Sequence, residues 1–169
     1  MRTRYAIATL ALSALGFVGI VGQEGYTDTA IRPVPGDVAT NGFGSTTGDN
    51  GQPLQLGEKT DPVRAVKRAV RDVSAKESVL KGCISADLHQ HEYDALVDLA
   101  YNVGPAAVCR SSIPKKLAAG AYEAACQTIL DFKKVQGRDC SLPENRSFCG
   151  GVWTRRQQMT HLCLTGERP

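Results

Sequence analysis

Turn-forming residues dominate the chain between Gly25 and Thr60 and interrupt any regular pattern of apolar positions. Glycine, proline, asparagine and aspartate are frequent here, and this composition favours short strands joined by tight turns over helices. The dipeptides Asn41-Gly42 and Asn50-Gly51 are typical of hairpin turns, because both residue types tolerate a positive φ angle. We therefore predict a small β-hairpin lobe in this part of the chain.

A long helix is predicted immediately after this stretch. Asp61 can cap the helix, and Pro62 fits its first position, where no backbone hydrogen bond is lost. Apolar residues then recur at helical spacing and define the predicted buried face: Val63, Val66, Val70 and Val73. A helix in this place is expected to link two lobes.

The remainder of the chain has the periodicity of several helices. The clearest is predicted from about His89 to Val103; it buries Tyr93 and Leu96 and ends at Gly104. Further helices are predicted over three ranges, with a loop over 136–151: 112–119, 121–132 and 152–164. The fold class is therefore α+β and mostly α, with a small β-hairpin lobe and a larger helical lobe.

An uncharged segment from Tyr5 to Gln23 follows two basic residues, Arg2 and Arg4. As a helix, its nineteen residues would be about 28 Å long, close to the thickness of a bilayer core. Nine of the nineteen are Ala, Gly, Ser or Thr, so the segment is only weakly apolar and is expected to insert without being held permanently. The arginines predict a cytoplasmic N-terminus. We therefore interpret residues 1–23 as a signal anchor.

A cleaved secretory signal is the alternative, because Gly22 is a small residue that could precede a cut. Cleavage there would leave Glu24 close to a frayed chain end, which is a poor support for a residue that does chemistry. A retained segment is therefore preferred.

Charge and cysteine content bound the environment of the protein. The net charge is only +3, but residues 110–169 carry ten Lys or Arg against five Asp or Glu, which favours an anionic partner such as a nucleic acid, a membrane surface or a cell wall. The cysteines form no C-x-x-C pair and fit disulfides made in an oxidising compartment: Cys83, Cys109, Cys126, Cys140, Cys149 and Cys163.

A metal site at His89, His91 and Glu92 is not expected, because residues two apart do not share a helix face.

Several separated motifs resemble the phage lysozymes of glycoside hydrolase family 24. They follow the family's order from Glu24 to about Leu164: Glu24-Gly25 after an apolar segment, Thr40-x-Gly42-Phe43-Gly44-x-Thr46, Tyr93-Asp94-Ala95-Leu96-Val97, Tyr101-Asn102-Val103-Gly104 and Thr154-Arg155-Arg156. The resemblance implies a lysozyme-like fold and makes residues 24–169 the catalytic domain.

The family's catalytic signature is only partly present. Glu24 matches the catalytic glutamate, which would donate a proton to the leaving oxygen of a glycosidic bond. Pro33 occupies the position nine residues later, where the family has an aspartate or cysteine. Thr40 lies sixteen residues after Glu24 instead of fifteen, and Ser45 replaces the family's histidine.

The second carboxylate therefore has two candidates. Asp37 is the first, because it lies three residues before Thr40, and Asp28 is the second. A turn-capping role is the alternative for Asp37. By resemblance, Thr40 would position the attacking water, and Arg155 would lie near Glu24, pair with it and tune it.

The activity that the resemblance implies is hydrolysis of the β-1,4 bond between N-acetylmuramic acid and N-acetylglucosamine in bacterial peptidoglycan, which would lyse the host cell. The resemblance implies no cofactor. Two other functions are open. One is a non-catalytic peptidoglycan-binding module, if the altered signature means a broken site. The other is a membrane-perturbing protein that kills the cell through its apolar segment.

The resemblance also implies the partners and the disulfide pairing. The partners would be peptidoglycan glycan strands and, through residues 1–23, the bacterial inner membrane; nucleic acid is not expected. The protein would be a monomer, located first at the host inner membrane and then in the periplasm. Fifteen pairings of six cysteines are possible, and the family-like placement favours three: Cys83 with Cys163, Cys109 with Cys126, and Cys140 with Cys149.

Overall fold

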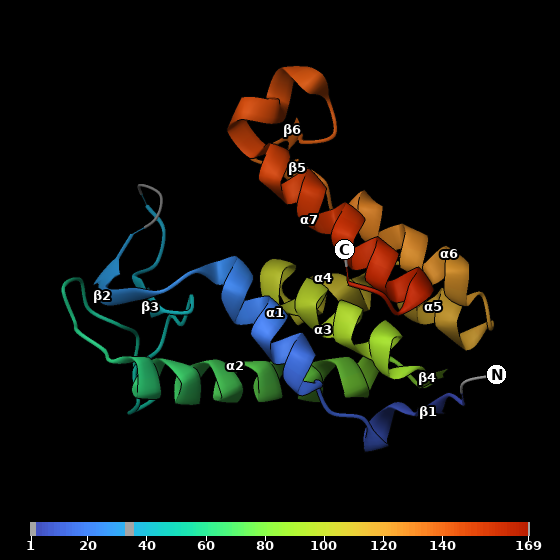
Figure 1. Cartoon of the computed structure of the whole chain (residues 1–169), viewed down its shortest axis with the longest axis horizontal. Coiled ribbons are helices and arrows are strands. Elements are labelled where there is room, and N and C mark those ends of the chain that lie inside the picture. The colour runs from blue at the N-terminus through green and yellow to red at the C-terminus, as the bar shows by residue number, and fades with distance from the viewer. Residues whose placement is uncertain (1–2, 33–35, 169) are drawn as a thin grey trace. The chain divides into compact units, whose positions relative to one another are not determined.

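The computed structural model describes residues 3–32 and 36–168, so Pro33 lies outside the described residues. The chain forms two compact units, one over residues 14–75 and the other made of the residues up to Ser13 together with those from Lys76 onward. Most elements are helices, and the strands form small antiparallel pairs, as the sequence predicted. Helix α2 (Pro62–Cys83) begins in the first unit and ends in the second (Figure 1).

The first unit combines helix α1 (Ala14–Glu24) with the hairpin of β2 (Thr27–Ile31) and β3 (Thr40–Gly42). The two strands lie side by side (Figure 1). They are antiparallel, with Thr27 opposite Gly42 and Ile31 opposite Thr40. Both predicted Asn-Gly turns are present. The backbone bonds between Asn41 and Ser45 close the first turn, and those of Gly48 with Gln52 and Gly51 close the second.

Helix α2 starts as predicted, because the Asp61 carboxylate accepts a hydrogen bond of 2.9 Å from the Arg64 amide. The predicted apolar face is wrong for three of its four valines. Val63, Val66 and Val70 are 65%, 40% and 49% exposed, and only Val73 is buried. Within this unit the buried positions include two small residues, Ala65 and Ala69.

Close approach of the hairpin explains the small side chain of Ala65 on α2. A Cβ atom added to Gly42 would lie 2.9 Å from Cβ of Ala65, so neither position has room for a larger side chain. Gly42 also has a φ of +62°, a conformation that favours glycine. Glycine at this point therefore lets the strand and the helix pack directly against each other.

Gly42→Ala is expected to destabilise the protein more than Gly51→Ala. Both glycines have a positive φ, so each substitution costs about 1–2 kcal/mol in backbone strain. Gly51 has no atom within 4 Å of an added Cβ, whereas Gly42 meets Ala65, which adds about 1–3 kcal/mol of overpacking. Urea unfolding measures both. An equal loss of unfolding free energy in the two variants would contradict the close approach of Gly42 to Ala65.

The second unit is helical and centres on α3 (Gln90–Val103). Tyr93, Leu96 and Leu99 are fully or almost fully buried, and Gly104 ends the helix at a φ of +85°, as predicted. The other elements of this unit after α2 are β4 (Asp87–Leu88), α4 (Pro105–Arg110), α5 (Ile113–Ala118), α6 (Tyr122–Gln127), η2 (Thr128–Asp131), β5 (Lys134–Val135), β6 (Arg138–Asp139), η3 (Pro143–Asn145) and α7 (Arg146–Thr165). The predicted loop at 136–151 thus contains part of a hairpin and the start of α7, whose kink lies at Cys149.

The three disulfides correct the implied pairing. The bonds are Cys83–Cys109, Cys126–Cys163 and Cys140–Cys149, with Cα atoms 5.2–5.7 Å apart, so only the last pair was predicted correctly. Cys109 lies in α4, a helix that the sequence pattern did not predict, and its sulfur is 3.8 Å from the carbonyl of Val79 on α2. That contact places Cys109 beside the end of α2.

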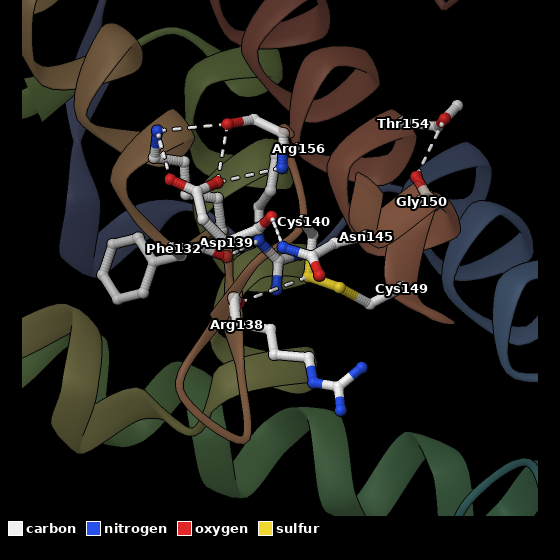
Figure 2. The surroundings of a disulfide bond; sticks show 11 residues. Phe132, Arg138, Asp139, Cys140, Asn145, Cys149, Gly150, Thr154 and Arg156 are labelled. Atoms are coloured by element: carbon white, nitrogen blue, oxygen red, sulfur yellow. Dashed lines mark hydrogen bonds and ion pairs between the residues drawn. A yellow bond between two sulfur atoms is a disulfide. The ribbon is translucent and has the colours of Figure 1, made fainter. Parts of the chain in front are cut away.

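The Cys140–Cys149 bond closes a short loop onto the start of α7 (Figure 2). The Asn145 side chain donates to the carbonyl of Asp139 at 2.8 Å within the same loop. Buried Arg156 donates from Nε to the carbonyl of Phe132 at 2.9 Å (Figure 2). Burial lowers the pKa of Arg156 to about 10, so its guanidinium remains charged at neutral pH.

The N-terminal segment is not one continuous helix. β1 (Tyr5–Ala6) pairs with β4, η1 (Ile7–Thr9) follows, and helix α1 begins only at Ala14. Across the described part of the chain, no helix combines the length and apolarity needed to cross a bilayer.

Candidate active site

Glu24 is the last residue of α1 and is half-buried. Gly25 follows with a φ of +70° and turns the chain toward β2. The turn after β3 returns to the same carboxyl group, because a Cβ atom added to Gly44 would lie 3.3 Å from Oε2 of Glu24. Glu24 and the glycine-rich turn are therefore brought together.

An aromatic pair lies next to both of these residues in the chain. The rings of Tyr26 and Phe43 have centroids 5.5 Å apart and are tilted by 51°. Tyr26 is two residues after Glu24, and Phe43 directly precedes Gly44. This contact ties the start of β2 to the glycine-rich turn and supports the position of the turn beside the carboxyl group.

Thr40 and the two candidate aspartates are distributed along the hairpin. Half-buried Thr40 starts β3 opposite Ile31. Asp37 is exposed in the connection between the strands, where its carboxylate accepts from the Val38 amide at 3.0 Å. Asp28 is exposed on β2 and accepts from the Thr29 hydroxyl at 2.8 Å.

A groove of about 720 Å³ lies along this connection. Its lining includes Asp37, Arg32, Thr46 and Leu54. Asp37 therefore borders a space that can hold a polar ligand, in addition to its turn contact.

Ser45, which the sequence comparison predicts in place of the family's histidine, is buried and hydrogen-bonded. It is 1% exposed, and its hydroxyl donates to the Asp72 carboxylate at 2.7 Å. The backbone of Ser45 also pairs with that of Asn41 in both directions. Ser45 thus fastens the glycine-rich turn to α2.

Buried Arg68 on α2 holds the polar interior of this unit, a role that the sequence pattern did not indicate. Its guanidinium donates to Asp49 at 2.5 Å and to the Asn41 side chain at 2.9 Å, and lies 4.0 Å from Glu58. Asn41 is fully buried, and its side-chain amide in turn donates a hydrogen bond to the carbonyl of Glu58. Only a long basic side chain reaches all three partners from a helix, so the position takes arginine instead of an apolar residue.

Asp49 is expected to make the protein sensitive to acid. Hydrogen bonds from Arg68 and Arg64 lower the pKa of Asp49 from 3.8 to about 2. A carboxyl group with a depressed pKa in the folded state stabilises the fold above its unfolded pKa, and this contribution is lost as the pH falls from about 4 toward 2. Asp49→Asn should therefore flatten the dependence of the unfolding free energy on pH in that range. An unchanged slope in urea titrations would contradict the role of this ion pair.

Arg155 on α7 donates to Asp98 on α3 at 2.8 Å, and both side chains are largely buried. Its neighbour Arg156 hydrogen-bonds the side chain of Asn102, near the end of α3. The motif Tyr101-Asn102-Val103-Gly104 thus meets the motif Thr154-Arg155-Arg156 inside the helical unit. Among the described residues, no group of three or more His, Cys, Asp or Glu could hold a metal ion.

Comparisons with known proteins agree on one family. The sequence profile of the phage lysozymes matches residues 21–158. The endolysin of Bacillus phage B103 is 30% identical, in a match that covers 92% of this chain and 55% of that endolysin. The SAR-endolysin of Escherichia phage 933W is 32% identical, with 85% of this chain and 80% of that protein covered. Among solved structures, the endolysin from Escherichia coli O157:H7 phage FAHEc1 has a TM-score of 0.80 at 24% identity, covering 95% of this chain and 98% of that chain.

The structural likeness confirms the lysozyme-like fold, and the sequence matches define the class of protein as a glycoside hydrolase. The chain belongs to the phage lysozyme family. It is a hydrolase of bacterial peptidoglycan.

Proposed function

We propose that the protein cleaves the β-1,4 bond between N-acetylmuramic acid and N-acetylglucosamine, with Glu24 as the general acid, and so lyses the host cell. The contact between the Glu24 carboxyl group and Gly44 carries the proposal. It sets the carboxyl group at the end of a helix, close to the backbone of the glycine-rich turn. A carboxylic acid held in this way can protonate the leaving oxygen of a glycosidic bond.

The hairpin supplies the candidates for the second role. Asp37 is proposed to activate or position water, since it borders the groove along the hairpin, and Thr40 on β3 is proposed to orient that water. Asp28 is the alternative. A separation of about 6.5–9.5 Å between the two carboxyl groups would give inversion at the anomeric carbon, and about 5–5.5 Å would give retention. Arg155, oriented by Asp98, has a supporting role in this proposal.

The two aspartates can be separated by comparing Asp37→Asn with Asp28→Asn. Each substitution removes one carboxylate and keeps the size of the side chain. The variant that lowers the rate of glycan cleavage while leaving the urea midpoint unchanged identifies the second catalytic group. If both variants cleaved glycan at the wild-type rate, the second role would belong to a residue other than these two.

The N-terminal segment is proposed to act as a signal anchor that is later released. Its apolar residues exceed what the fold buries, since Leu15 and Val18 on α1 are 71% and 62% exposed. Exposed apolar side chains of this kind suit a segment that is inserted in a bilayer before it is released. The related protein of Escherichia phage 933W is a SAR-endolysin. In this proposal the monomeric protein is first tethered to the host inner membrane, with its N-terminus in the cytoplasm, and then acts in the periplasm.

The trigger of release is proposed to be collapse of the membrane potential. The segment from Tyr5 to Gln23 contains no cysteine, so a thiol exchange within it cannot control release. Release would let residues 14–24 form helix α1, which presents Glu24.

A turbidity assay distinguishes the enzyme from a binding module. Purified protein is added to bacteria stripped of their outer membrane, and light scattering and bound protein are both recorded. An enzyme clears the suspension at catalytic amounts. Binding without clearing would support the non-catalytic alternative.

A further inference from the structure

Three acidic side chains of the helical unit share one feature: each binds the N-terminal segment that precedes α1. They are Glu77 on α2 and Glu92 and Asp94 on α3. Glu92 is 4% exposed and Asp94 is 6% exposed. Buried carboxylates are costly unless they are paired, so their partners are a structural requirement of this unit.

Arg4 provides the partner of Glu92. Its guanidinium donates two hydrogen bonds to that carboxylate, at 3.1 Å from Nε and 2.7 Å from Nη2, in the bidentate arrangement that suits arginine. The guanidinium also lies 3.5 Å from the centroid of the Tyr122 ring. The hydrogen bonds to Glu92 raise the pKa of Arg4 above its ordinary value.

The end of the segment is held just as specifically. The Leu12 amide donates to Glu77 at 2.7 Å, while the amide and hydroxyl of Ser13 donate to Asp94 at 3.0 and 2.5 Å. Helix α1 begins at the next residue, Ala14. Leu12 and Ser13, the last two residues before this helix, are therefore each held by a carboxylate.

The middle of the segment adds backbone and apolar contacts. Lys81 donates to the carbonyl of Leu10 at 2.5 Å, and Gln90 donates to that of Ala11 at 2.8 Å. Ile7 and Leu10 are 5% and 7% exposed. Residues 4–13 thus occupy a site that has a specific partner for charge, backbone and apolar groups along its length.

We propose that this surface is a docking site for the released N-terminal segment, and that the Arg4–Glu92 pair holds the released state. The inference rests on the proposed anchor. While the segment spans the membrane, Arg4 lies on the cytoplasmic side and the helical unit is outside, so the pair cannot form. Arg4 must cross the membrane to reach Glu92, and once paired its return would leave a buried carboxylate without its guanidinium. Docking therefore opposes reinsertion.

Glu92→Gln tests the docking directly. Glutamine still accepts a hydrogen bond from the His89 amide, as Glu92 does at 2.7 Å, so the start of α3 is kept while the charge opposite Arg4 is lost. In the purified soluble full chain, amide hydrogen exchange of residues 5–13 is expected to become about tenfold faster or more, with little change in α7. Glu167→Gln, an exposed substitution near the C-terminus, is the control and should match the wild type. Unchanged exchange in Glu92→Gln would overturn the proposal.

Membrane fractionation separates this inference from the anchor proposal. Cells expressing each full-length chain are fractionated before and after a protonophore collapses the membrane potential. The wild type should move from the membrane to the soluble fraction, whereas Glu92→Gln should remain at least several-fold more membrane-bound after collapse. Equal release of the two chains would overturn the holding role of the pair. A wild-type chain that is never membrane-bound would refute the anchor, while the exchange experiment would still decide whether the segment docks through Glu92.

Discussion

Glu24→Gln is expected to slow peptidoglycan cleavage by roughly 10²–10⁴-fold, the range that a general acid contributes. Glutamine has nearly the same shape as glutamate, so the contact with Gly44 can persist, but it has no proton to give to the leaving oxygen. The rate of clearing of outer-membrane-stripped bacteria measures the loss.

The matched control for this variant is Glu167→Gln, which removes an exposed carboxylate after α7 and should retain wild-type activity. Urea unfolding checks that the Glu24 variant is folded. If a folded Glu24→Gln protein cleared cells at the wild-type rate, the assignment of the acid would be wrong.

A chain that begins at Gln23 is expected to lose activity by a similar factor. The truncation removes nearly all of α1, so Glu24 would lie at a frayed end without the helix that holds it. It also deletes Arg4 and the amides that bind Glu77 on α2 and the buried Asp94 on α3. Cleavage of purified peptidoglycan by the refolded chain is the measurement.

A chain that begins at Thr3 is the companion, because it retains every described contact of the N-terminal segment. It should cleave peptidoglycan as fast as the full-length protein. Full activity of the chain that begins at Gln23 would show that the segment is dispensable for the site, and would revive the cleaved secretory signal as the interpretation of residues 1–23.

Local signals allowed much of the fold to be predicted. Asp61 caps α2, and Gly104 ends α3 at a positive φ, because caps depend on a few neighbouring residues. The buried face of α2 was predicted wrongly for the opposite reason. One of its buried positions, Ala65, meets Gly42, a residue distant in sequence, and the contact leaves no room for a larger side chain. Periodicity reports apolar spacing but does not indicate which partner a helix meets.

The disulfides and the site show the same difference between features set by neighbouring residues, which could be predicted, and features set by residues distant in sequence, which could not. Cys140 and Cys149 are close in sequence and were paired correctly, whereas the position of Cys109 depends on the unpredicted helix α4. Glu24 could be proposed from its motif. Its closeness to Gly44 and the contacts of Arg68 could not be predicted, because both depend on how residues distant in sequence pack within the unit.

Analysis of the new glycan ends tests the central claim most directly. Purified peptidoglycan is digested with the wild-type chain or with Glu24→Gln, reduced with borohydride, and analysed for the sugar at each new reducing end. The account predicts reduced N-acetylmuramic acid with the wild type and almost none with Glu24→Gln. New N-acetylglucosamine ends, cleavage of peptide bonds instead of glycan bonds, or equal products from the two chains would contradict it.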